Sequence, residues 1–198
     1  MVSKAHSQQG FTLVELLISM TVLVMMSLVF LVFFKSALFD YLDLQTDATN
    51  LTQLSTEEMR LGNVIRGLTV INSASANNLS VYAYFNPNDT YVSLVDYYLQ
   101  TSGKSTDLIA SVTPMTANPP IGTPITSETQ TYTIMNDFYE PSGGSLFTYF
   151  DDTFSPITLP INNLEEVKAI QINLATPLTN GGNQAINVQV TLRNRETN

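Results

Sequence analysis

Residues 11–34 read FTLVELLISMTVLVMMSLVFLVFF, with Glu15 as the single charged residue. As an α-helix this run is roughly 36 Å long at about 1.5 Å per residue, and the hydrocarbon core of a bilayer is about 30 Å thick. The apolar part of an ordinary secretory signal is shorter, about 7–15 residues. We therefore predict one membrane-spanning helix over residues 11–34, rather than a cleaved secretory signal.

The orientation of this helix is indicated by its flanks. Lys4 lies before the span and Lys35 directly after it, which is a weak signal by the rule that basic residues stay in the cytoplasm. The remainder of the chain has no second apolar run of membrane length. We expect a single-pass protein of the cytoplasmic (inner) membrane, with its N-terminus in the cytoplasm and its C-terminal part outside.

Composition narrows the chemistry that is open to the chain. It has 198 residues, no cysteine and one histidine, His6, so thiolate chemistry and disulfides are excluded. A Ser/His/Asp triad needs histidine and the usual zinc ligand sets need cysteine or histidine, and His6 lies outside the part of the chain that follows the span. We expect no enzyme, no cofactor and no metal site.

The charge distribution bears on the partners. The net charge is −9, and the 8 lysine and arginine residues are scattered along the chain without forming a run. An acidic chain without a basic patch is repelled by nucleic acid. We predict that this chain alone does not bind nucleic acid.

Glu15 is an acid inside an otherwise apolar run. A charge at the centre of a span costs about 2.5–3.5 kcal/mol on insertion scales, and less near the end, so such residues usually have a function. The alternative is an acid in the first helical turn, favoured by the helix dipole and close to water at the interface. The charge by itself leaves these two explanations evenly balanced.

Residues 10–17, GFTLVELL, resemble the prepilin signature shared by type IV pilins and type II secretion pseudopilins. A short polar leader precedes them and the apolar helix follows. The resemblance implies that a prepilin peptidase cuts between Gly10 and Phe11 and that Phe11 is then N-methylated. It also implies partners: other pilin or pseudopilin subunits and an inner-membrane assembly platform, with the product a cell-surface or periplasmic filament.

The resemblance implies a role for Glu15 that has a physical basis. Cleavage creates an α-amino group at Phe11, which is cationic at neutral pH. In a filament Glu15 of one subunit could pair with the Phe11 ammonium of a neighbour, and the pairing would offset the cost of burying both charges. On this hypothesis the cut enables assembly, because the precursor has no such amine beside the helix.

The helix is predicted to continue well beyond residue 34. No glycine or proline occurs between Phe11 and Leu61, and after Lys35 the pattern becomes amphipathic. We read four segments: 1–10 leader, 11–34 transmembrane and assembly helix, 35–68 amphipathic extension, and 69–198 head. Apolar residues predicted on one face of the extension are Leu44, Ala48, Leu51, Leu54, Leu61, Ile65 and Leu68.

The head reads as strands. Residues 79–85 and 91–99 are strand-like, and residues 169–175 and 185–193 alternate apolar and polar side chains across a turn-rich connection, which predicts a hairpin with one buried face. Residues 113–130 are rich in Thr, Pro and Ser and are expected to form an exposed loop. We predict an α+β, pilin-like fold in which the long N-terminal helix packs on an antiparallel β-sheet head.

The order of apolar segments in the head is similar to minor pilins of the PilW type and to the larger minor pseudopilins. Many major pilins carry a proline or glycine in the apolar half of the helix, and this chain has neither there. We therefore interpret the chain as a minor subunit that primes or caps a filament. The alternative is a membrane-anchored extracytoplasmic binding module, an adhesin or receptor, whose helix is a simple signal anchor.

Three features of the head have possible chemistry. Asp151 and Asp152 could contribute to a Ca²⁺ site, but the alternating ligands of a calcium loop are missing. Glu165 and Glu166 are better explained as a solvated turn. The 9 tyrosines are expected in core or half-buried positions.

Overall fold

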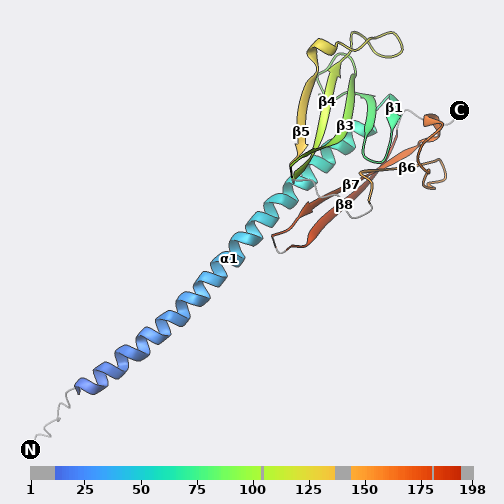
Figure 1. Ribbon diagram of the computed structural model, residues 1–198. Coiled ribbons are helices and arrows are strands. Elements are labelled where there is room, and N and C mark those ends of the chain that lie inside the picture. Colours follow the sequence, from blue (N-terminus) through green and yellow to red (C-terminus); the bar gives the residue numbers. More distant parts are fainter. Residues whose placement is uncertain (1–11, 104, 137–143, 180, 193–198) are drawn as a thin grey trace, which may run out of the picture. The chain divides into compact units, whose positions relative to one another are not determined.

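The long helix α1 (Leu13–Arg66) has 54 residues, and eight strands follow it (Figure 1). The computed structural model describes residues 12–103, 105–136, 144–179 and 181–192. The helix ends where Gly67 donates its backbone N–H to the carbonyls of Asn63 and Val64, each at 3.2 Å. One long N-terminal apolar helix with antiparallel sheets confirms the α+β, pilin-like fold.

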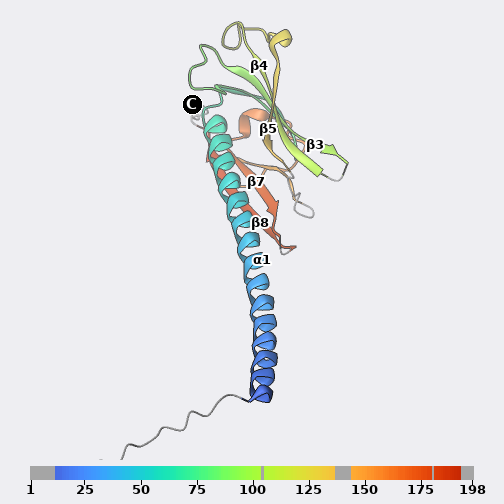
Figure 2. The ribbon, with the colours of Figure 1, turned by 90° about the vertical axis from the view of Figure 1, so that its left-hand side faces the viewer.

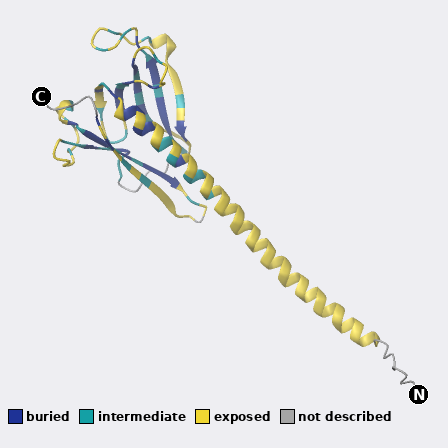
Figure 3. Ribbon diagram, turned by 180° about the vertical axis from the view of Figure 1, so that it is seen from behind, coloured by how far each residue is buried: buried dark blue, intermediate teal, exposed yellow. Residues whose placement is uncertain are grey.

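The chain divides into two compact units, one ending at Thr46 and one beginning at Asp47. In the first unit the sides of the helix are exposed throughout (Figure 3). In the second unit the core lies between the last turns of α1 and the strands. The buried residues of the helix are Leu54, Leu61, Gly62, Val64 and Ile65.

The predicted apolar face of the helix extension is only partly buried. Leu54, Leu61 and Ile65 are at most 1% exposed, as expected. The prediction was wrong for Leu44, which is 70% exposed, and for Ala48, which is also exposed. Within the second unit Thr179, in the connection between β7 and β8, contacts this part of the helix through two hydrogen bonds to the carboxylate of Asp47.

Five antiparallel strands form the larger sheet, in the order β1-β2-β3-β4-β5 (Figure 2). The row of directly opposed residues Val81, Val95 and Val112 crosses three of them. All three valines are buried, so this face of the sheet is turned to the core. The strands are β1 (Val70–Ala74), β2 (Leu79–Ala83), β3 (Ser93–Ser102), β4 (Ser105–Pro114) and β5 (Gln130–Met135).

The smaller sheet has the order β6-β7-β8, built from Phe147–Phe150, Ala169–Pro177 and Asn183–Thr191. Its β7–β8 pair is the hairpin predicted from alternation, and Figure 2 shows it as a separate ribbon from the larger sheet. Gly181 in the turn has a φ of 82°, which side chains other than glycine rarely adopt. The buried face is confirmed: Ile170, Ile172 and Leu174 are fully buried.

Hydrogen bonds join the smaller sheet to the turn between β1 and β2 of the larger sheet. The N–H of Phe147 donates to the carbonyl of Ala76 at 2.9 Å, and the hydroxyl of Tyr149 donates to the carbonyl of Ser75 at 2.8 Å. Tyr149 is 1% exposed, so this bond satisfies a buried hydroxyl that would otherwise cost free energy. The strands of both sheets and the end of α1 therefore share one core.

The region 113–130 is more ordered than the expected exposed loop. Pro114 ends β4, Gln130 begins β5, and a short 3₁₀-helix, η1 (Thr126–Glu128), lies between them. The connection closes on itself, because Thr116 donates its N–H to Thr123 O at 3.0 Å and Met115 pairs with Pro124. Its side chains are mostly exposed, as predicted, but its backbone forms a folded hairpin loop.

Candidate functional site

The start of α1 is organised by a reciprocal pair of residues, Thr12 and Glu15. The carboxylate Oε2 of Glu15 accepts hydrogen bonds from the backbone N–H and the hydroxyl of Thr12, both at 3.0 Å. In return the N–H of Glu15 donates to Thr12 Oγ1 at 3.3 Å. Thr12 O also accepts the first helical bond, from Leu16 N at 3.2 Å. This is a capping box, with Thr12 as the N-cap.

The capping box gives Glu15 a local role that sequence reasoning missed. Thr12 and Glu15 are spaced as Thr-x-x-Glu immediately before an apolar run, which is a recognised signal for a helix start. The first N–H groups of a helix have no partner within it, and they need one most where water is scarce. Glu15 therefore stabilises the helix end in addition to any role in assembly.

Only one carboxylate oxygen is used in this box. Both bonds from Thr12 reach Oε2, and within the described residues Oε1 has no hydrogen-bond partner. A carboxylate can accept several hydrogen bonds, so Glu15 can hold the helix start and still receive a cation from elsewhere. Gly10 and Phe11, the predicted cleavage and methylation residues, lie outside the described residues.

The helix from Leu13 to Phe34 has an apolar exposed surface. The best 18-residue window has a mean hydropathy of 2.7, and none of it is buried in the chain. Its hydroxyl groups are satisfied within the helix: Ser19 donates to Leu16 O at 2.9 Å and Ser27 donates to Leu23 O at 2.8 Å. Hydroxyls that donate to backbone carbonyls in this way can enter lipid or an apolar assembly without leaving a hydrogen-bond donor unpaired.

In the head, the carboxylate of Asp151 is used by its own loop. Its Oδ1 accepts from Thr153 N at 2.9 Å, Thr153 Oγ1 at 2.8 Å and Ser155 N at 2.9 Å. The hydroxyl of Thr153 and the N–H of Ser155 hold the pKa of Asp151 below its usual range. Asp151 is therefore explained as a turn residue, and across the described ranges no three His, Cys, Asp or Glu side chains gather to hold a metal.

The other head candidates also have structural explanations. Glu165 and Glu166 belong to the exposed 3₁₀-helix η2 (Leu164–Glu166), as the solvated-turn reading predicts. The side chain of Asn163 caps this helix by accepting from Glu165 N at 3.1 Å. Of the tyrosines, Tyr97 and Tyr149 are core residues, whereas Tyr91 is 44% exposed.

Comparison with known proteins supports the N-terminal reading. Residues 5–31 match the family model described as the prokaryotic N-terminal methylation motif. The chain matches no curated protein and no solved structure. The motif and the apolar helix together are consistent with a type IV pilin- or pseudopilin-like protein and indicate an anchor in the inner membrane. The motif implies processing by a prepilin peptidase and assembly with other pilins.

Proposed function

We propose that this chain is a minor type IV pilin or pseudopilin that is cut between Gly10 and Phe11, methylated at Phe11 and inserted into a filament through α1. The observation that carries the proposal is the methylation motif over residues 5–31, placed directly on an exposed apolar helix. In the membrane that surface contacts lipid. In the filament it contacts the helices of neighbouring subunits, so the same residues serve both states.

Glu15 makes the assembly step depend on processing. The cut gives Phe11 a cationic amino group, and Oε1 of Glu15 is not used by the capping box. The pair forms between subunits, Glu15 of one with the Phe11 ammonium of the next. A buried charge with a partner is far less costly than one without, so unprocessed or charge-deleted subunits are excluded from the filament.

The proposed minor role rests on the regularity of the helix. α1 is one continuous α-helix from Leu13 to Arg66, and its apolar half contains no glycine or proline. Sharp kinks in helices occur mostly at proline, glycine or a π-bulge, so we expect this helix to stay continuous as the filament is packed. Such a subunit suits the end of a filament, where it primes extrusion from the inner-membrane platform or caps the tip. The head lies outside the cytoplasm in this arrangement.

Mass spectrometry of the native N-terminus, with and without a prepilin peptidase, tests the proposal. We expect a chain that begins at N-methylated Phe11 only when the peptidase is present. An intact Met1, or a cut downstream of Phe34, would overturn the proposal and favour the anchored binding module. That rival also predicts that a generic transmembrane helix can replace residues 11–34 without loss of function.

The minor role has its own measurement. Sheared filaments are quantified for this chain against the major subunit, and filament number is counted in a strain that lacks the chain. We expect a small fraction of subunits and a large loss of filaments. A chain that makes up most of the filament mass is a major subunit.

A further inference from the structure

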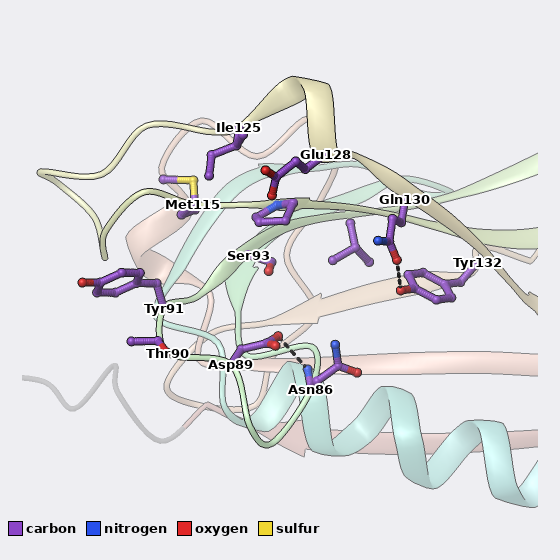
Figure 4. A pocket seen from close by; sticks show the side chains of 12 residues that line it. Asn86, Asp89, Thr90, Tyr91, Ser93, Met115, Ile125, Glu128, Gln130 and Tyr132 are labelled. Atoms are coloured by element: carbon purple, nitrogen blue, oxygen red, sulfur yellow. Dashed lines mark hydrogen bonds between the residues drawn. The ribbon is translucent and has the colours of Figure 1, made fainter.

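The head contains a cavity of about 390 Å³. One wall is the core-facing side of the larger sheet, where Ser93, Val112 and Gln130 line it. The segment 86–91 and the β4–β5 connection supply the other walls (Figure 4). A cavity of this size lies within the range of sites that hold small molecules.

The lining mixes aromatic and polar groups. Tyr91 and Tyr132 supply rings, Asp89 and Glu128 supply carboxylates, Gln130 supplies a carboxamide and Ser93 supplies a hydroxyl. Figure 4 shows these side chains arranged around the same space. Among the described residues that line the cavity there is no lysine or arginine, so an anionic ligand would meet two carboxylates without a compensating cation.

Ser93 places a hydroxyl on the wall of the cavity. The residue is 4% exposed, and its hydroxyl is not one of the buried side-chain atoms without a hydrogen-bond partner; in the described part of the chain that set holds Glu57 Oε2 alone. Ser80 and Thr113, each 6% exposed, use their hydroxyls with Asn72 Nδ2 at 3.1 Å and Thr129 Oγ1 at 2.9 Å. The Ser93 hydroxyl instead faces the cavity, where a ligand hydroxyl can replace water as its partner.

The polar groups around Ser93 are already oriented. The hydroxyl of Tyr132 donates to Gln130 Oε1, which leaves the Gln130 amide NH₂ as a donor to the cavity. Asp89 Oδ2 accepts from Asn86 N at 3.1 Å, which fixes the carboxylate and leaves its second oxygen as an acceptor. The cavity wall therefore carries both hydrogen-bond donors and acceptors. Because these side chains are already held in place, binding a ligand costs little free energy for ordering them.

The walls are also tied to each other. The N–H of Val92 donates to Asn118 Oδ1 at 2.9 Å, which joins the segment before β3 to the loop after β4. The ring of Tyr132 contacts the ring of Phe85, with centroids 5.1 Å apart. These contacts hold the walls of the cavity together.

From this chemistry we propose that the cavity binds a neutral sugar ring, either as a free sugar or as part of a polysaccharide. Sugar hydroxyls both donate and accept, which matches the mixed set around Ser93, and the C–H faces of the ring can lie against a tyrosine. An ammonium ligand only donates, so it would leave the Gln130 amide unmatched. An apolar ligand would leave both carboxylates and the Ser93 hydroxyl without partners.

The test is saturation-transfer NMR on the full chain in phosphocholine micelles, because maltoside detergents are themselves sugars. The probes are the methyl glycosides of glucose, galactose, mannose and N-acetylglucosamine, with maltotriose and chitotriose as polysaccharide fragments. Cadaverine and glucose 6-phosphate are the cationic and anionic counter-probes. We expect saturation of at least one neutral sugar and of neither counter-probe. Tighter binding of a trisaccharide than of its monomer assigns the site to polysaccharide.

Two variants place the binding in the cavity. Ser93→Ala removes one hydroxyl without changing the fold, and Tyr91→Ala truncates an exposed ring; each is expected to weaken binding at least about fivefold. Glu165→Gln and Tyr41→Ala, at exposed positions that do not line the cavity, are the controls and should bind as wild type. The proposal is overturned if no neutral sugar is saturated, if cadaverine alone is, or if both cavity variants bind unchanged. Since the assay needs no processing or assembly, its failure leaves the filament role untouched.

Discussion

Glu15 receives two hydrogen bonds from Thr12, one from its backbone N–H and one from its hydroxyl, each 3.0 Å long and both to Oε2. The proposed pairing with a neighbouring subunit would give this side chain a second purpose with a different chemical need. Starting the helix requires only an acceptor oxygen, whereas pairing with a neighbour's ammonium requires a negative charge. The two purposes can therefore be separated by substitution.

The Glu15→Gln variant is predicted to be processed normally but to enter filaments at least about tenfold less than wild type. The amide oxygen still accepts from Thr12, but the charge that offsets the neighbour's ammonium is gone. Thr12→Ala is the matched control: it removes the cap, at about 1 kcal/mol of helix stability, and keeps the charge. Immunoblots of sheared filaments against total processed chain measure both. Equal incorporation of Glu15→Gln and wild type would contradict the charge-pairing role.

Asp47 is predicted to hold the end of the β7–β8 hairpin. Its two carboxylate oxygens accept from Thr179, from N at 3.0 Å and from Oγ1 at 3.1 Å. Asp47→Ala should cost about 0.5–1.5 kcal/mol, because these exposed donors can turn to water instead. Hydrogen exchange at the Thr179 amide and urea unfolding check this, with Asp43→Ala as the control. Unchanged protection of the Thr179 amide would show that the contact adds nothing.

Gly62→Ala is predicted to stabilise the head. Gly62 is buried in the helix, and a Cβ there would lie 3.6 Å from Val190 Cγ2, an ordinary contact distance. Replacing a helical glycine by alanine at a position with room gains about 0.5–1 kcal/mol. Urea unfolding followed by circular dichroism measures the gain. A loss of stability would mean that β8 cannot accept the added methyl group.

Gly122→Ala is predicted to disrupt the loop between β4 and β5. A Cβ at Gly122 would overlap the backbone carbonyl of Ala117, which cannot move aside as a flexible side chain can. We expect faster hydrogen exchange and proteolysis over residues 116–124, with Gly62→Ala as the control glycine. Because Asn118 of this loop bonds to Val92 N at 2.9 Å, sugar binding should weaken as well. Wild-type protection of the loop would contradict the predicted overlap.

Two tyrosines are predicted to ionise late. Burial raises the pKa of Tyr97 and of Tyr149, whose hydroxyl also bonds to Ser75 O at 2.8 Å. The pKa of each phenol is higher in the folded protein than in the unfolded chain, where it is about 10. The neutral phenols therefore contribute their full stabilisation below about pH 10, and this stabilisation is lost as the pH rises towards the folded pKa values. Absorbance at 295 nm should show them ionising only as circular dichroism reports unfolding. Tyr149→Phe should remove one late phenol, and ionisation of all tyrosines in one early transition would contradict the prediction.

Some parts of the fold could be predicted from local patterns and others could not. The alternation around Ile170 and Ile172 was sufficient for the β7–β8 hairpin, because a two-residue period and a turn are local properties. The face predicted from Leu44 onwards failed at its first positions, since a sequence pattern shows which side is apolar but not where a partner begins. The backbone hairpin in the region 113–130 was missed because its Thr, Pro and Ser content is typical of loops in general.

The candidate site also has some features that a local sequence pattern predicts and others that it does not. The prediction of Gly10, Phe11 and Glu15 came from a contiguous motif, which sequence shows directly, and it stays a prediction for cleavage, methylation and pairing. The capping box has a sequence signal, Thr12-x-x-Glu15, but the charge of Glu15 within an apolar run predicts a role for its charge and not for its acceptor oxygens. The cavity could not be foreseen, since no spacing in the sequence connects its walls.

The sequence by itself determined the apolar span, the processing motif and the unbroken helix, because hydropathy, a contiguous signature and the absence of glycine or proline act over neighbouring residues. Only the tertiary structure decided which strands pair into two sheets and which side chains meet around the hydroxyl of Ser93. Asp89, Ser93 and Glu128 come from three segments, and the register of β3 with β4 and β4 with β5 brings them to one space. Long-range register follows from packing over the whole core, which no local stretch of residues contains.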